Sequence, residues 1–202
     1  SNEIYGLNDH NWHHIAYVRR NSRIYYFIDG KVIEPISGIL YDDDIQLVSG
    51  SPLVGRADYS IIGFMDEVRW SNIARYTSEF TLPNTTFTSD ANTVLLIHSN
   101  TTDGSTTFTD SSSYAHVLTA GNNAQHSAPK MGTGMAVFDR PSSSNVVIPE
   151  NTDWDFGSGD FTMECWVNMR SVSPGDFNTV MWLGSLQFDY KVSSTELRIY
   201  MY

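Results

Sequence analysis

The 202-residue sequence is poor in cysteine, in basic residues and in long apolar runs. Its single cysteine, Cys165, excludes an intramolecular disulfide framework. Only 12 lysines and arginines stand against 23 acidic residues, and the formal net charge of -11 predicts no binding to nucleic acid or anionic lipid. No apolar run approaches the roughly 18 residues needed to cross a bilayer. We therefore expect no membrane insertion.

The sequence does contain many short runs rich in Val, Ile, Tyr, Phe and Trp, separated by Gly, Asn, Asp and Ser. Their period of two predicts an all-β chain. At most one short helix is expected, over residues 72–79. The length suffices for the core of one large antiparallel sandwich but not for two. The expected strands cover residues 14–20, 23–29, 31–33, 45–48, 53–55, 60–70, 93–98, 134–139, 145–148, 160–169, 179–183, 186–190 and 195–202.

Residues 81–92 form a polar stretch with Pro83 and no periodicity, which predicts a connection. Neither residues 1–80 nor residues 93–202 carry enough strands to close two sheets alone. We therefore expect a single domain over residues 1–202. The alternative is that halves of neighbouring chains complete each other.

Three blocks resemble the laminin G-like and pentraxin-type domains of the concanavalin A-like lectin and glucanase superfamily. Residues 63–80, GFMDEVRWSNIARYTSEF, are similar to the closing signature of the family. Residues 93–125 are similar to its opening strand and D-S-S-G loop, and residues 136–169 to the strands that follow.

The blocks stand in permuted order. The family motif W-x-H-[IV]-A-x-x-R, here starting at Trp12 and ending at Arg19, completes a strand, turn and strand if Tyr202 is read on into Ser1. The resemblance implies a circularly permuted two-sheet jelly roll whose ends, Ser1 and Tyr202, lie close together.

A candidate sugar-binding row follows from the alternation in residues 160–169. Phe161 and every second residue after it are expected in the core, so the intervening residues share the other face. The resemblance implies that this face belongs to an open concave sheet. Hydrogen-bonding side chains beside aromatic faces suit a sugar, although the same pairs also suit cross-strand charge ladders. The candidate residues are Glu164, Trp166 and Asn168 of this strand, together with Arg198 and Tyr200 of the strand expected over residues 195–202 and Glu67 and Arg69 of the strand expected over residues 60–70.

The resemblance also implies a calcium ion at one end of the sandwich. Relatives use the Asp of the D-S-S-G loop and the first acid of D-E-V-R, which correspond here to Asp110 and Asp66. Ser113 and Ala115 replace the usual loop glycines, which alters the carbonyl geometry. A turn-stabilising role is the alternative for Asp66.

Catalysis is not expected. Glycoside hydrolases need two carboxyl groups about 5 to 9 Å apart, whereas the adjacent Asp66 and Glu67 are predicted to point to opposite faces. The resemblance implies a non-catalytic recognition module that binds a glycan or cell-surface polysaccharide, in an extracellular, cell-surface or virion protein such as a phage tail-type fibre. The alternatives are a structural or protein-adhesion domain without glycan binding, and a glycoside hydrolase whose acids meet from separate strands.

Overall fold

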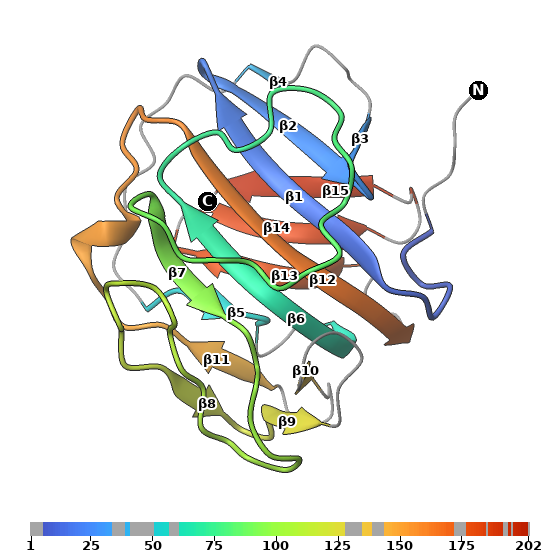
Figure 1. The fold of residues 1–202 in the computed structure, drawn as a ribbon. Helices are drawn as coiled ribbons and strands as arrows, with labels where there is room; N and C mark the ends of the chain where they lie inside the picture. The colour runs from blue at the N-terminus through green and yellow to red at the C-terminus, as the bar shows by residue number, and fades with distance from the viewer. Residues whose placement is uncertain are drawn as a thin grey trace.

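The computed structural model describes residues 6–33, 39–40, 51–56, 61–127, 135–138, 144–171, 177–184, 186–191, 194 and 196–201, with the backbone alone at residues 39, 135, 137, 177, 196, 200 and 201. These residues form two antiparallel β-sheets that face each other (Figure 1). Their only helical turn is the 3-10 turn Thr152–Trp154. No described helix is long and apolar enough to cross a bilayer. The prediction of an all-β, two-sheet antiparallel sandwich is confirmed.

The first sheet has nine strands in the order β3-β2-β1-β12-β6-β10-β9, with β4 paired to β2 and β7 paired to β6. β6 pairs with β12 along one edge, and with β10 and then β7 along the other. The bounds are β1 His13–Arg20, β2 Arg23–Ile28, β3 Lys31–Ile33, β4 Ile39–Leu40, β6 Ile62–Ser71, β7 Thr93–Ile97, β9 Gln125–Ser127, β10 Met135–Phe138 and β12 Phe161–Ser171.

The second sheet has six strands in the order β15-β14-β13-β5-β11-β8. Each sheet draws strands from both sides of residues 81–92, and β1 from the first half pairs along its length with β12 from the second. The bounds are β5 Leu53–Val54, β8 Thr119–Gly121, β11 Asn145–Val147, β13 Phe177–Leu183, β14 Leu186–Lys191 and β15 Glu196–Met201.

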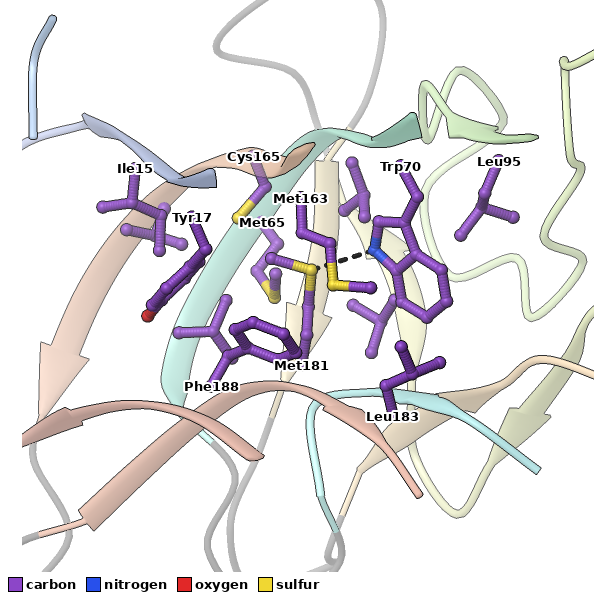
Figure 2. Packing of buried hydrophobic residues seen from close by; sticks show 14 of the residues in the cluster. Ile15, Tyr17, Met65, Trp70, Leu95, Met163, Cys165, Met181, Leu183 and Phe188 are labelled. Atoms are coloured by element: carbon purple, nitrogen blue, oxygen red, sulfur yellow. Dashed lines mark hydrogen bonds between the residues drawn. The ribbon is translucent and has the colours of Figure 1, made fainter. Parts of the chain in front are cut away.

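The core lies between the sheets and follows the alternation predicted for β12. Phe161, Met163, Cys165, Val167 and Met169 are all fully buried, as expected. Figure 2 shows Met163 and Cys165 of the first sheet facing Met181 and Phe188 of the second. The indole Nε1 of Trp70 lies 3.0 Å from the sulfur of Met181 and ties the two sheets together. Burial raises the pKa of the Cys165 thiol well above its ordinary value, so this thiol is unreactive.

A third layer covers the outer face of the first sheet. Residues 72–92, here called the covering segment, leave the end of β6, pass over β12 and β1, and return to β7 (Figure 1). The segment packs Tyr76 and Phe80 on Phe27 of β2. The ion pair between Arg75 and Asp90, at 2.7 Å, closes its two ends. The predicted connection is therefore part of the folded structure.

One expectation about the structure is wrong, and two others concern residues that the structure does not describe. The helix expected over residues 72–79 is wrong, because this backbone bonds to β12 instead of to itself: the Arg75 N–H donates to Thr162 Oγ1, and the Thr162 hydroxyl donates to the carbonyl of Ile73. The strand expected over residues 45–48, and the expected closeness of Ser1 and Tyr202, lie outside the described residues. The short strands β4, β8 and β9 were not predicted.

Gly30 joins the covering segment to the turn after β2, and replacing it with alanine tests that join. The backbone φ at Gly30 is +76°, its carbonyl accepts the N–H of Phe80 at 2.9 Å, and an added Cβ would overlap the Phe80 carbonyl oxygen. Gly104 is a matched control, because its φ is +78° but nothing lies within 4 Å of its added Cβ. We expect Gly104→Ala to lower the free energy of unfolding by about 1 kcal/mol, and Gly30→Ala by at least about 2 kcal/mol more. Equal losses in urea denaturation would contradict this.

Candidate functional site

The predicted sugar-binding row of β12 lies beneath the covering segment. Glu164 and Asn168 are fully buried, and Trp166 is only 8% exposed. Trp166 packs with Phe87 of the covering segment and Leu96 of β7. The expectation that this face is open is therefore not met, because the covering segment, which includes the predicted connection over residues 81–92, lies across it.

Glu164 is the centre of a buried hydrogen-bond network. One carboxylate oxygen accepts from the Nε and Nη2 of Arg69 at 2.8 and 2.6 Å, and the other accepts from His14 Nε2 at 3.0 Å and from the Tyr76 hydroxyl at 2.6 Å. Burial alone would raise the pKa of Glu164, but the hydrogen bond from His14 and the charge of Arg69 lower it overall. The predicted charge ladder is thus present, and the covering segment completes it through Tyr76.

A β-bulge places Asp66 and Glu67 differently from the prediction. Between the pairs Arg69↔Glu164 and Asp66↔Trp166, β6 has one residue more than β12, and Glu67 takes a φ of +52°. The extra residue interrupts the alternation. Met65 and Val68, on either side of the two acids, are both core residues, so the strict alternation on which the prediction of opposite faces for Asp66 and Glu67 rested does not hold.

The two acids of the bulge have different surroundings. Glu67 is 1% exposed and accepts from His98 Nδ1 at 2.8 Å and from the backbone N–H of Phe87 at 2.5 Å. Asp66 is fully buried, and its Oδ1 accepts the backbone N–H of Glu67 at 2.8 Å. Its Oδ2 has no hydrogen-bond partner among the described residues. Burial, together with the charge of Glu67, raises the pKa of Asp66 to about 8.

Asp110, the other predicted calcium ligand, is held entirely by donors of its own loop and of β7. Its Oδ1 accepts the backbone N–H groups of Leu96 and Ser112, both at 2.9 Å. Its Oδ2 accepts the Ser112 hydroxyl at 2.8 Å and the His116 Nδ1 at 2.7 Å. The other ring nitrogen of His116 lies 2.9 Å from Asp153. Asp110 therefore organises the loop from within.

Asp66 and Asp110 share no hydrogen-bond partner among the described residues. They belong to separate hydrogen-bond networks, and Ca²⁺ needs about six to eight oxygen ligands around one point. Within the part of the chain that the structure describes, no group of three or more His, Cys, Asp or Glu is arranged to hold a metal ion.

The last two predicted ligand residues belong to the other sheet. Arg198 is half-buried on β15, paired in register with Asp189 of β14, whereas Glu164 lies on the first sheet. Tyr200 pairs in register with Gln187, and its side chain lies outside the described residues. Because β15 pairs only with β14 among the described strands, the structure does not bring these two positions to the Glu164 row.

Comparisons of the chain with protein-family models, with curated proteins and with solved structures found no match.

A groove of about 420 Å³ lies beside the covering segment, on the outer face of β1, β2 and β3. Its apolar wall consists of Tyr25, Phe27, Val32 and Tyr76, and residues 77–79 form the opposite rim with Arg20. Tyr25 is half-buried, and the guanidinium of Arg20 lies over its ring at 4.7 Å. This groove was not predicted. The signal was present in β2, where the run RIYYFI is apolar on both faces and so predicts a strand covered on both sides.

Proposed function

We propose that this chain is a non-catalytic recognition module that binds carbohydrate in the groove between β2 and residues 76–79. The observation that supports this proposal is the combination of an aromatic wall, formed by Tyr25 and Tyr76, with the charged and hydroxyl side chains of Arg20, Ser78 and Glu79 on one groove. Sugar rings stack their C–H faces on aromatic rings, and their hydroxyl pairs bind to planar groups such as guanidinium and carboxylate. The volume also suits a ligand of a few sugar units.

The rim of the groove is held by the protein itself. Arg20 donates to the carbonyl of Thr77, and Lys31 pairs with Glu79 at 2.8 Å. Tyr76 is stacked on Phe80 with ring centroids 3.7 Å apart, and its hydroxyl is anchored on Glu164. The aromatic wall is thus preorganised, which lowers the entropic cost of binding. In this proposal Glu164 acts through Tyr76 and does not touch the sugar.

The family resemblance enters as part of the same proposal. We propose a circularly permuted laminin G-like domain of an extracellular, cell-surface or virion protein. The all-β sandwich supports it, as does the burial of the two motif residues His14 and Arg19, both of which are fully buried. Arg19 donates to the Gly157 carbonyl at 2.7 Å, so the motif arginine fastens β1 to the loop before β12.

A glycan-array screen of the full chain tests the function, with Tyr25→Ala as the loss variant. We expect a specific hit whose apparent affinity falls at least about tenfold in Tyr25→Ala, because one stacked ring contributes about 1 to 2 kcal/mol. Tyr114→Ala is the matched control, since Tyr114 is an aromatic 43% exposed and does not line the groove. The array is run in calcium buffer and again after chelation.

A blank array, or a hit that Tyr25→Ala leaves unchanged, would overturn the proposal and favour a structural or protein-adhesion domain. One observation supports that second function. In the loop after Asp110, Val117 is 80% exposed and Tyr114 is 43% exposed. His116 anchors this loop through its contacts with Asp110 and Asp153, so the exposed apolar groups are held in place. A protein partner would use such a rim loop.

A further inference from the structure

A second cavity, separate from the groove, lies beyond the end of β7. It measures about 270 Å³ and shares no residue with the groove. Its lining contains no Lys, Arg, Asp or Glu and no aliphatic side chain. The lining residues are His98, Ser99, Asn100, Thr101, Thr107, Thr109, Ser111 and His126. We propose that this cavity binds one neutral sugar unit, as a site independent of the groove.

The hydroxyl groups of the cavity are free to bind a ligand. Five of the eight lining residues are Ser or Thr, and their hydroxyls make no hydrogen bond to any other described residue. Thr107, Thr109 and Ser111 are exposed at the mouth, so a ligand can reach them. Each hydroxyl can donate one hydrogen bond and accept two. This capacity matches the hydroxyl groups of a sugar, which also donate and accept.

The wall of the cavity is fixed. The ring nitrogens of His126 lie 3.0 Å from the Ser99 carbonyl and 2.9 Å from the Thr107 carbonyl, so this ring joins the two loop segments that line the cavity. The ring also stacks on Phe108 with centroids 4.3 Å apart. His126 is 2% exposed. The hydroxyls are thus held on a rigid frame, which favours binding without reorganisation.

His98 adds one acceptor to the hydroxyls. Its Nδ1 lies 2.8 Å from the buried carboxylate of Glu67 and donates to it, and in the Nδ1–H tautomer of imidazole the other ring nitrogen, Nε2, is an acceptor. A sugar hydroxyl in the cavity can donate to Nε2. Glu67 is then a positioning residue, because it fixes the tautomer of His98 without contacting the ligand. This gives the predicted ligand residue Glu67 an indirect role.

Neutral ligands are favoured over anions. An oxoanion site needs a cation or several backbone N–H donors, whereas this lining has no Lys or Arg and lies in front of the Glu67 carboxylate. The net charge of -11 also opposes anion binding. The volume lies just below the roughly 300 Å³ at which ligand pockets begin. One sugar ring therefore suits the cavity better than a chain.

Amide NMR of the full ¹⁵N-labelled chain tests the proposal, with the methyl glycosides of glucose, galactose, mannose and N-acetylglucosamine as probes. Titration to about 50 mM is needed, because a single neutral sugar unit binds in the millimolar range. We expect one probe to shift the amides of residues 98–111, and Thr109→Val with Ser111→Ala to weaken that binding at least fivefold. Tyr25→Ala should leave it unchanged, which separates this site from the groove.

Three outcomes would overturn the proposal. The first is that no probe shifts these amides. The second is that the variant Thr109→Val with Ser111→Ala binds as tightly as the wild type. The third is that inorganic phosphate shifts the same amides more strongly than any sugar. Fold is checked by the spectrum outside residues 98–111. If the double variant does not fold, Thr107→Val alone takes its place, because Thr107 is exposed and its hydroxyl has no described partner.

Discussion

Replacing Glu164 with glutamine is expected to lower the free energy of unfolding by about 4 kcal/mol, because it leaves a buried guanidinium without its anion. Arg69 is 8% exposed and bonds the Glu164 carboxylate through two nitrogens. Its guanidinium also lies 4.1 Å from the centre of the Phe87 ring, under the covering segment. Glutamine keeps the shape, but if its single oxygen accepts from Tyr76, its NH2 group faces the Arg69 donors. The loss therefore combines the missing charge with the missing hydrogen bonds to Arg69. Urea denaturation at pH 7 measures it.

An exposed ion pair provides the matched control for this prediction. Lys31 and Glu79 are both more than half exposed and lie 2.8 Å apart, and Glu79→Gln should cost less than about 1 kcal/mol. A double-mutant cycle with Arg69→Met isolates the buried pair. The double variant should lose less unfolding free energy than the sum of the two single losses, because removing both charges leaves no buried charge without its partner. A loss below about 1 kcal/mol in Glu164→Gln, or strict additivity, would show that Glu164 is not the centre of the network.

Local pattern was enough to predict the sandwich and the two faces of its central strand. The alternation in β12 assigned five residues to the core, and all five are fully buried. What it could not show was that the other face is also buried. That burial depends on partners far away in sequence, since Glu164 bonds Tyr76 across 88 residues and His14 across 150.

The covering segment shows why composition alone did not predict the packing of residues 81–92. Residues 81–92 are mostly polar and were predicted to be a connection, but Phe87 within them is 5% exposed and its N–H bonds the buried Glu67. A single anchored aromatic carries no periodic signal. The bulge at Glu67 is equally hidden, because an extra residue in β6 can be seen only against its pairing with β12.

Replacing Asp66 with asparagine is expected to stabilise the protein, and to do so more strongly as pH rises. The pKa of Asp66 is raised from 3.8 to about 8, chiefly by burial and then by the charge of Glu67. An acid whose pKa is higher in the folded than in the unfolded protein binds its proton more tightly when folded, so its ionisation opposes folding. The wild type therefore loses stability as pH rises through the window from about 4 to about 8, whereas asparagine stays neutral throughout.

The pH slope is the measurement that decides this prediction. One pKa unit corresponds to about 1.4 kcal/mol, and relaxation of the site on ionisation reduces the total, so we expect Asp66→Asn to gain about 2 to 5 kcal/mol at pH 8 and close to nothing near pH 4. Asparagine retains the Oδ1 acceptor for the Glu67 N–H, so the bulge keeps its shape. Asp103→Asn, at an exposed position, serves as control and should leave the slope of unfolding free energy against pH unchanged. Parallel profiles of unfolding free energy against pH for Asp66→Asn and the wild type would contradict this prediction. They would mean that Asp66 is ionised in the folded protein, and that its buried carboxylate is stabilised by more than its single backbone hydrogen bond.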